Sequence, residues 1–233
     1  MPKQVQKGAL SRAIYDHLID IDGLHINSEQ LAGDMYAWYK IDKYRYGIIL
    51  YDVMGHGLSA ALVSMSIRSL LRGIISKYQE PTQVIRELNY HIYNLFQDNE
   101  RFSSFFFTTL YILVDSYKKE IQYANAGHPP GLLLSNDGTL QILDKGCIPC
   151  GIYSKISIDK GVFHYQPKAK ILIYTDGLID SVDSLGVKPT SVVEQCFSQQ
   201  RGTNSRNTIQ NIRQLIKENK RNDDICIVCA TLA

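Results

Sequence analysis

Four short stretches of the sequence place aspartate at the start or end of a segment patterned like a strand, and in three of them it stands beside glycine, threonine, asparagine or a second aspartate. In chain order they are Gly33-Asp34, Asp52, Thr175-Asp176-Gly177 and Asn222-Asp223-Asp224. Taken singly, each aspartate is better explained as a turn or strand-end residue. Together they supply carboxylate oxygens, the ligands that hard divalent cations such as Mg²⁺ and Mn²⁺ prefer. The combination predicts a metal site.

Side-chain alternation along a strand assigns two of these acids to apolar rows. Each is expected to share a strand face with two apolar residues: Ile48 and Leu50 for Asp52, and Leu172 and Tyr174 for Asp176. A carboxylate at the end of an apolar row is costly to desolvate unless a positive charge compensates it. Bound cations would supply that charge.

The segment YDVMGHGLSAALVS, residues 51–64, has a competing interpretation. Its Gly55, Gly57 and Ala60 have the spacing of a dinucleotide-binding turn. That fold needs a strand after the helix and an acid about 20 residues past the glycines. Here a second helix is predicted instead, and the first acid, Glu80, falls between the two helices. Asp52 would also repel a pyrophosphate by on the order of several kcal/mol, so the metal interpretation is favoured.

Two histidines accompany these motifs. His56, between the two glycines, could serve as a general acid, but the positive end of the helix that starts there disfavours its protonated form. We therefore interpret His56 as a structural residue or a neighbour of the ligands. His128, in AGHPP, is interpreted as a residue that fixes its loop by hydrogen bonding.

The spacing of four cysteines suggests a different kind of metal site. Cys147-X-X-Cys150 and Cys226-X-X-Cys229 together have the spacing of a four-thiolate zinc site. The second pair lies in ICIVCATL, which alternates like a strand, so its two thiols are expected on opposite faces. We interpret the cysteines as buried small apolar residues, and the absence of a secretion signal argues against a disulfide framework.

Length and composition indicate an ordinary globular domain. The chain has 233 residues and a formal net charge of +2, with 45% hydrophobic and 21% charged residues. No Lys/Arg stripe favours nucleic acid. The N-terminus lacks the apolar core of a signal peptide, and no run approaches the ~18 apolar residues of a membrane span. A cytoplasmic protein without a nucleic-acid or membrane partner is expected.

Hydrophobic periodicity predicts the elements that must position these residues. They are an amphipathic start over 3–12; strands near 22–28, 34–41 and 45–53; helices over 58–78 and 82–97; strands over 105–116, 120–126, 131–135, 139–143, 155–165 and 170–176; helices over about 189–199 and 205–219; and a last strand over 225–232. Antiparallel strands interrupted by helix pairs indicate an α+β sandwich.

The motifs occur in the order seen in a known family. LAGDMY, YDVMGHGLSAALVS, FFFTTLYILVD, YANAGHPPGLLL, LIYTDGLIDS and NDDICIVCATL resemble the SpoIIE/RsbU-like branch of the PPM metal-dependent serine/threonine protein phosphatases. The resemblance runs from about Gln6 to the C-terminus. One departure is Cys150, which stands where relatives tend to have leucine. No arginine near Asp34 could clamp the substrate phosphate as in the eukaryotic relatives, and this branch generally lacks that arginine.

The resemblance implies a fold and a ligand set. The fold would be a PPM-type sandwich of two antiparallel β-sheets flanked by pairs of antiparallel helices, with two Mn²⁺ or Mg²⁺ ions per domain at one end. By position, the ligands would be Asp52, bridging both ions; the carbonyl of Val53; Asp176; Asp223; and Asp34, directly or through water. The residues expected to support the ligands without binding the ions are Asp224, Gly55, His56, Gly57, His128 and Gly177.

The implied activity is hydrolysis of phosphoserine or phosphothreonine in a protein, with Asp52 and Asp176 acting through a water that the ions activate. The implied substrate is a phosphorylated anti-sigma-factor antagonist with a STAS domain, in a bacterial partner-switching stress or sporulation pathway. Two alternatives stay open: a two-metal phosphoesterase for a small phosphate ester, and a non-catalytic phosphatase-like binding module. Loss of Asp52, Asp176 or Asp223 would favour the binding module, and all three are present.

Residues 1–12 are expected to form a linker or switch helix ahead of a phosphatase domain over 13–233. In relatives this region joins the domain to an upstream sensor or coiled coil, so control by a sensor domain or a regulatory protein is implied. A helix this short is marginal alone in water. Docking or homodimerisation through it would have to order it.

Overall fold

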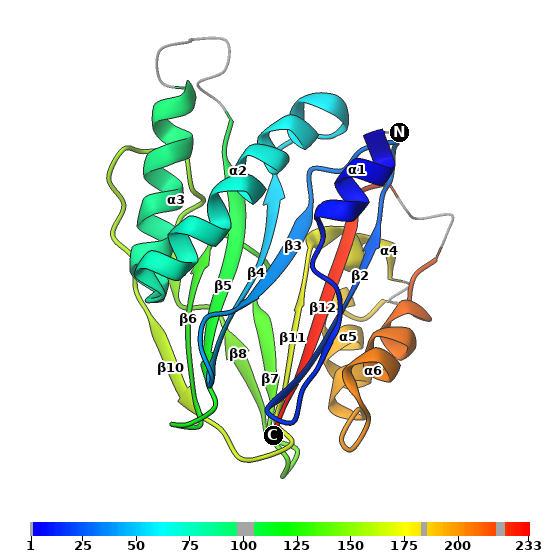
Figure 1. The fold of residues 1–233 in the computed structure, drawn as a ribbon. Coiled ribbons are helices and arrows are strands. Elements are labelled where there is room, and N and C mark those ends of the chain that lie inside the picture. The colour runs from blue at the N-terminus through cyan, green and yellow to red at the C-terminus, as the bar shows by residue number, and fades with distance from the viewer. Residues whose placement is uncertain (1, 97–104, 183–185, 218–221) are drawn as a thin grey trace.

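A computed structural model of the chain describes residues 2–96, 105–182, 186–217 and 222–233. It contains two β-sheets that stack face to face, with helices on both outer faces (Figure 1). The predicted α+β sandwich is confirmed.

Sheet A is antiparallel throughout. Its strands, in spatial order, are β1 (Ile14–Tyr15), β2 (Ile19–Ile26), β12 (Ile225–Leu232), β11 (Lys170–Tyr174), β7 (Gly131–Leu134) and β8 (Leu140–Leu143). Because β1 is so short, it covers only the beginning of β2, and the rest of β2 forms an edge of the sheet.

Sheet B differs from the prediction in one pairing. Its strands, in spatial order, are β10 (Gly161–His164), β6 (Glu120–Ala126), β5 (Phe107–Asp115), β4 (Arg45–Val53) and β3 (Met35–Lys40), with β9 (Gly146–Cys147) beside β6. All these pairs are antiparallel except β6 with β9, which is parallel. The sheet is therefore mixed at one short pairing.

The helices form two outer layers and one N-terminal element. They are α1 (Pro2–Ala9), α2 (Gly57–Tyr78), α3 (Pro81–Phe96), α4 (Asp176–Ser181), α5 (Pro189–Ser198) and α6 (Ser205–Arg213). The pair α2 and α3, which was predicted to lie outside the sheets, packs on sheet B. The outer face of sheet A carries three helices, α4, α5 and α6, where a pair was expected.

Three buried clusters explain this layering. The central cluster lies between the sheets and includes Ile48 and Leu50 of β4. A second lies between sheet B and α2 with α3, and a third between sheet A and α4 to α6. A central strand such as β4 is therefore buried on both faces, which is why β4 has a nearly continuous run of apolar residues.

Several predicted boundaries are wrong. The N-terminal helix ends at Ala9 and not at 12, and β2 runs over Ile19–Ile26 where a strand over 22–28 was predicted. Helix α6 ends at Arg213, short of the predicted 219. Only 161–164 of the predicted strand 155–165 is a strand, because β6 offers partners to those residues alone. The positions 97 and 219, where two helices were predicted to end, lie outside the described residues.

The strand-parity prediction for the cysteines is confirmed. Cys226 belongs to the cluster between the sheets, and Cys229 belongs to the cluster on the outer face of sheet A. Cys150 is buried in the cluster beneath α2 and α3, and Cys147 packs against the same cluster. Residues three apart on β12 thus point to opposite faces.

Helix α2 is the one described segment that is long and apolar enough, by length and composition, to cross a membrane. Eight of its residues are buried, and that face packs on sheet B. The core helices of soluble proteins pass the same test, so α2 is explained as a core helix.

Candidate metal centre

The strand pairing brings the four acidic stretches to one end of the sandwich. Asp52 is next to last in β4, and Asp34 immediately precedes β3, whose first residue pairs with Tyr51. In sheet A, Asp176 follows the end of β11 and Asp223 precedes the start of β12. Because β11 and β12 are antiparallel neighbours, that end and that start lie together. Because the two sheets stack face to face, the pair from sheet B and the pair from sheet A lie at the same end of the sandwich.

The expected orientation of Asp176 is wrong. Leu172 and Tyr174 belong to the cluster on the outer face of sheet A, so continued alternation would point Asp176 outward. Instead β11 ends at Tyr174, and Asp176 becomes the first residue of α4. The turn redirects the side chain, and its charge raises the pKa of Asp52.

Asp34 is deeply buried in the cluster. Its side chain is 3% exposed, and its Oδ2 has no hydrogen-bond partner in the described part of the chain. Burial and the neighbouring charge of Asp52 raise the pKa of Asp34 well above its usual range. Burial, together with the charges of Asp176 and Asp223, raises the pKa of Asp52 to about 6.

Two further acids lie on the exposed side. Partial desolvation and the charge of Asp223 raise the pKa of Asp176. Partial desolvation and the charges of Asp224 and Asp180 raise the pKa of Asp223, although the N–H of Asp224 donates to Asp223 Oδ1 at 2.7 Å and opposes this shift. The charged neighbours with the largest influence on these acids are therefore mostly other acids.

Asp224 has a different environment from its neighbour. Its Oδ1 accepts from the backbone N–H of Ser28 at 2.7 Å and from the Ser28 hydroxyl at 2.8 Å. Its Oδ2 accepts from the N–H of Gly33 at 2.9 Å. Both oxygens of this buried carboxylate are used to hold the loop that leads to Asp34.

Glycine is needed at two places in this centre. Gly55 and Gly57 have φ values of 88° and 76°, in the left-handed region that other residues rarely adopt. Gly177 packs closely against the backbone of Asp224, just before β12, because a Cβ at this position would lie 2.0 Å from the carbonyl oxygen of Asp224. The first pair shapes the turn after Val53, and Gly177 allows α4 to approach Asp223.

His56 lies at the rim of the centre. It precedes α2 without capping it, its side chain is 74% exposed, and its Nδ1 is 2.7 Å from Oε1 of Glu29. Its charge also lowers the pKa of Asp223. The residue thus connects the glycine turn to the loop that follows β2.

His128 lies beneath the centre. Its Nδ1 is 2.8 Å from the hydroxyl of Thr108, the residue paired with Asp52 across β4 and β5. Asn125 holds the loop through hydrogen bonds with the backbone N–H of His128 at 2.7 Å and its carbonyl at 2.9 Å. Burial lowers the pKa of His128 to about 3, so the ring is neutral at physiological pH.

The donor set fits hard divalent cations in its chemistry. It consists of carboxylate oxygens and a backbone carbonyl, with one buried carboxylate oxygen that has no partner, which is the ligand chemistry of Mg²⁺ and Mn²⁺. Within the described residues, no three His, Cys, Asp or Glu side chains already stand close enough together to enclose an ion. Ions of this kind keep several water ligands, so the acids need not converge as a closed cage.

Sequence reasoning missed three contributors. Ser28 and Glu29 lie in a loop with no motif, and only the folded chain brings them to Asp224 and His56. Asp180 lies within the quoted segment LIYTDGLIDS, four residues after Asp176, and helical spacing could have revealed it. Its charge raises the pKa values of Asp176 and Asp223.

Comparison with known proteins finds a matching family model and similar curated proteins. The family model described as stage II sporulation protein E (SpoIIE) matches residues 42–233. The chain is 36% identical over 184 residues to the phosphoserine phosphatase RsbP of Bacillus subtilis (strain 168), covering 79% of this chain and 45% of that protein. It is 25% identical over 198 residues to the phosphoserine phosphatase RsbU of the same organism, covering 84% and 57%. The chain spans about half the length of these curated relatives.

Solved structures share the fold. The SiaA-PP2C domain of Pseudomonas aeruginosa matches with a TM-score of 0.83 and 16% identity, covering 99% of this chain and 94% of that one. The RsbU and RsbW domains of Rv1364c from Mycobacterium tuberculosis match with a TM-score of 0.78 and 22% identity, covering 92% and 61%. The predicted PPM-type architecture is confirmed.

Proposed function

This chain belongs to the stage II sporulation protein E (SpoIIE) family, and from that premise we propose that it is a metal-dependent protein phosphatase acting on phosphoserine or phosphothreonine. The observation that carries the proposal is the cluster of Asp34, Asp52, Asp176 and Asp223 at one end of the sandwich, whose pKa values are all raised. Such a cluster destabilises the folded chain unless bound cations compensate its negative charge.

Each acid has a proposed role. Asp52, whose charged neighbours come from segments beside both sheets, would help to hold both Mn²⁺ or Mg²⁺ ions, and the carbonyl of Val53 would help to hold one of them. Asp176 and Asp223 would hold the second ion, and Asp34 would bind directly or through water. When bound, such ions lower the pKa of a water and neutralise charge on phosphoryl oxygens. Among the relatives' structures, one is RsbX in complex with magnesium.

Other side chains keep these acids in place. Asp224 positions the loop before Asp34, because both of its oxygens accept hydrogen bonds from that region. Thr108 and the neutral His128 support the strand beside Asp52. His56 positions the glycine turn through Glu29 and is not the proton donor to the leaving group in this proposal.

The proposed substrate is a phosphorylated anti-sigma-factor antagonist of the STAS type, in a bacterial partner-switching pathway, and the proposed location is the cytoplasm. Support comes from the relatives, which are named phosphoserine phosphatases RsbP and RsbU. The test compares hydrolysis of phosphorylated STAS proteins, p-nitrophenyl phosphate and nucleoside monophosphates, with Mn²⁺, with Mg²⁺ and with chelator. Preference for a phosphoprotein supports the proposal, preference for a small ester favours a phosphoesterase, and no turnover with either ion favours a binding module.

We also propose that α1, within a linker or switch segment over residues 1–12, regulates the domain over 13–233. Gln6 donates to the carbonyl of Ala32 at 2.7 Å and accepts from its N–H at 3.0 Å, two residues from Asp34. Arg68 of α2 donates to the carbonyl of Ala9 at 2.7 Å. An upstream sensor, a regulatory protein or homodimerisation through α1 would act along these contacts.

The regulatory proposal has its own experiment. Turnover of a phosphoprotein at saturating Mn²⁺ is measured for the chain, for a fusion of α1 to a dimeric coiled coil, and for a deletion of residues 1–12. We expect low activity in the chain and higher activity in the fusion, because displacements of about 1 Å at a catalytic centre change rates about a hundredfold. Equal rates in all three would rule out a switch.

A further inference from the structure

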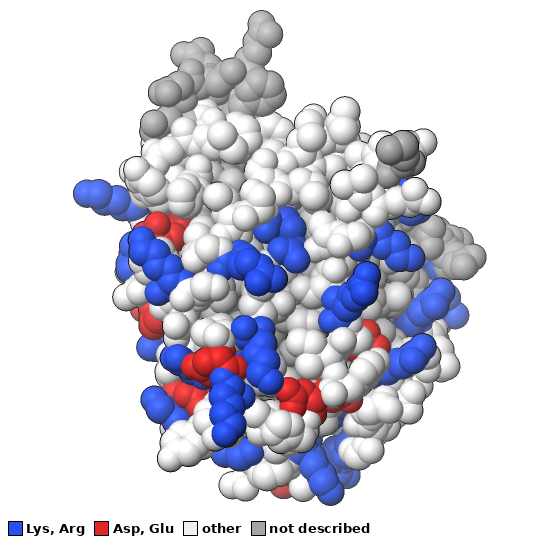
Figure 2. Space-filling view, in the orientation of Figure 1, with Lys and Arg blue, Asp and Glu red and all other residues white. Residues whose placement is uncertain are grey.

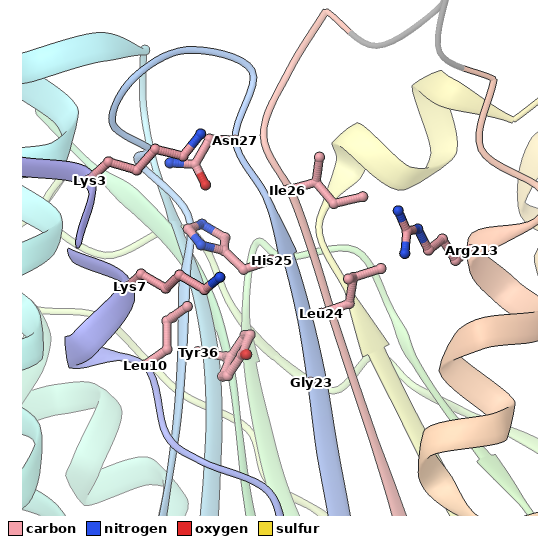
Figure 3. A pocket seen from close by; sticks show the side chains of 10 residues that line it. All are labelled: Lys3, Lys7, Leu10, Gly23, Leu24, His25, Ile26, Asn27, Tyr36 and Arg213. Atoms are coloured by element: carbon pink, nitrogen blue, oxygen red, sulfur yellow. The ribbon is translucent and has the colours of Figure 1, made fainter. Parts of the chain in front are cut away.

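A pocket of about 510 Å³ lies between α1 and α6, over the second half of β2 (Figure 3). One wall carries Lys3 and Lys7 of α1, the other carries Arg213 of α6, and the floor is formed by the end of β2 from Gly23 and by Asn27, which follows it. The pocket takes no part in the centre described above.

The floor of this pocket is an open strand edge. β1 pairs with β2 only at Ile21 and Asp20, so beyond Ile21 the described chain places a strand on one side of β2 alone, namely β12. Ser11 and Arg12 lie farther along the chain's path and hydrogen-bond to Trp38 of β3. The N-terminal segment therefore covers the edge of β2 as far as Ile21 and leaves the edge beyond Ile21 open.

The direction of the free backbone groups follows from the hydrogen bonds that are made. Ile19 accepts from the N–H of Asp16 on the side away from β12, and the N–H of Gly23 donates to the carboxylate of Asp22 at 2.8 Å. Because N–H and C=O groups alternate sides along a strand, His25 also points its backbone groups away from β12. Within the described residues, the carbonyl of Gly23 and both backbone groups of His25 have no hydrogen-bond partner.

The walls carry charges that nothing nearby neutralises. The side chains of Lys3, Lys7 and Arg213 make no ion pair or hydrogen bond with any described residue. The acid at this edge, Asp22, already accepts hydrogen bonds from Tyr15 and Gly23. Figure 2, which looks at this side of the molecule, shows Lys and Arg spread over it, with most of the Asp and Glu in its lower half.

We propose that this pocket binds an extended, acidic segment of a partner protein as an added strand on β2. Strand addition satisfies the unpaired backbone groups, and alternate side chains of the added strand face the two walls. Figure 3 places α1 and α6 on opposite sides of β2. Acidic residues on one face of the segment pair with Lys3 and Lys7, and acidic residues on the other face pair with Arg213.

The pocket is connected to the centre through its floor and through one wall, although the proposal does not depend on the proposed catalysis. β2 leads through Asn27 to Ser28, which holds Asp224, and α1 is bonded through Gln6 to Ala32, beside Gly33. A segment docked on β2 therefore lies against the two elements that hold the loop before Asp34. This places a protein-docking groove next to the regulatory helix.

The experiment measures binding directly. A fluorescein-labelled peptide Val-Glu-Glu-Val-Glu-Glu-Val, which has acids on both strand faces, is titrated with the whole chain and followed by anisotropy. The matched probes are the same peptide with Lys for Glu, the same peptide with N-methylated backbone amides, and inorganic phosphate as competitor. We expect binding of the acidic peptide only, weakened about tenfold by raising salt from 0.05 to ~0.5 M, because exposed ion pairs are screened.

Variants separate the two contributions. The charge reversal Lys3→Glu/Lys7→Glu/Arg213→Glu should weaken binding about tenfold or more, whereas Lys43→Glu/Lys118→Glu/Lys155→Glu, with the same charge change elsewhere on the surface, should not. His25→Pro removes one edge-facing N–H and should weaken binding about tenfold, while His25→Ala keeps that N–H and should not. Melting curves confirm that each variant is folded.

Three results would overturn the proposal. These are equal affinity of the charge-reversed variant and its control, equal affinity of the N-methylated and parent peptides, and full displacement by inorganic phosphate, which would identify an anion site without strand addition. Amide shifts confined to Gly23–Asn27 and α1 on peptide addition would support it. Loss of phosphatase activity in any variant bears on the proposed function and leaves the binding result unaffected.

Discussion

Two buried charged groups in this protein differ in how far the surrounding protein provides them with hydrogen-bond partners. Lys170 of β11 is 1% exposed, yet its ammonium donates to the carbonyls of Gln200 and Thr203 at 3.1 Å and to the hydroxyls of Thr203 and Thr208. Asp34, at the end of the sandwich, is 3% exposed and keeps one oxygen without a partner. The amine ties the turn between α5 and α6 to sheet A, while the carboxylate is surrounded by other acids.

The difference distinguishes a structural charge from a functional one. A buried charge whose hydrogen-bonding capacity is filled by the protein contributes to folding and has nothing left to offer a ligand. A buried charge whose partners carry the same sign is stabilised only when something else binds. Asp224 repeats the first case within the centre itself, because both of its oxygens are occupied.

The largest expected effect is on turnover. Asp52→Asn should lower hydrolysis of p-nitrophenyl phosphate with Mn²⁺ by about a thousandfold, because a neutral amide binds and bridges cations far less well. Asp137→Asn, in an exposed hairpin turn, is the matched control and should keep full activity. Circular dichroism should show both variants folded, and normal turnover by the Asp52 variant would disprove the two-metal assignment.

A second large effect should appear at Lys170 and should concern folding. Lys170→Met leaves four oxygen acceptors without their buried donor, so the free energy of unfolding should fall by about 3 kcal/mol. Lys118→Met, on the surface, is the control. Urea denaturation measures the loss, and kcat of the folded fraction should stay unchanged. A fall in kcat of the folded fraction would show that Lys170 is not purely structural and would contradict the contrast with Asp34.

His128 predicts a pH dependence. Its pKa is about 3 in the folded protein and ~6.5 when unfolded, so the unfolded chain binds more protons between these values. Stability from this neutral ring is present above pH ~6.5 and lost as pH falls. Between pH 7 and pH 5 the metal-free chain should lose about 2 kcal/mol more than His128→Gln. Parallel pH profiles of the two proteins would show that the ring titrates normally.

Asp34 should show the opposite sign from Lys170 when substituted. With chelator at pH 7.5, Asp34→Asn should raise the free energy of unfolding by about 1 kcal/mol, because it removes a buried charge beside Asp52. Since the folded pKa of Asp34 is raised, its ionisation destabilises the fold as pH rises, and the gain should shrink toward pH 4. Manganese titration by calorimetry should meanwhile show weaker binding; destabilisation at pH 7.5 would class Asp34 as structural.

The smallest effect is expected on β12. Cys226→Val/Cys229→Val should leave turnover intact and change stability by less than about 1.5 kcal/mol per site, because both thiols pack as small apolar groups. The check is metal analysis of purified protein beside urea denaturation. Stoichiometric zinc that disappears in the double variant would show that the chain has a second kind of metal site.

Local patterns predicted much of the sandwich. The apolar run of β4, the pair α2 and α3, and the opposite orientations of Cys226 and Cys229 follow from periodicities of 2 and 3.6 residues that any short window contains. The same reasoning overextended the strand before β10, where alternation continues but no neighbouring strand is paired. It also missed α4, because Asp176 looked like the last residue of a strand.

The chemistry of the centre could also be predicted from the sequence, because aspartate, glycine and threonine at strand ends limit it to oxygen ligation of hard cations. What local sequence could not decide is which acid stays free. Asp223 and Asp224 are adjacent and identical in type, yet Ser28 reaches one of them across 196 positions and leaves the other at the rim. Such contacts depend on how the sheets stack, because the partners that fill or spare a carboxylate oxygen come from chain segments that meet only in the folded protein.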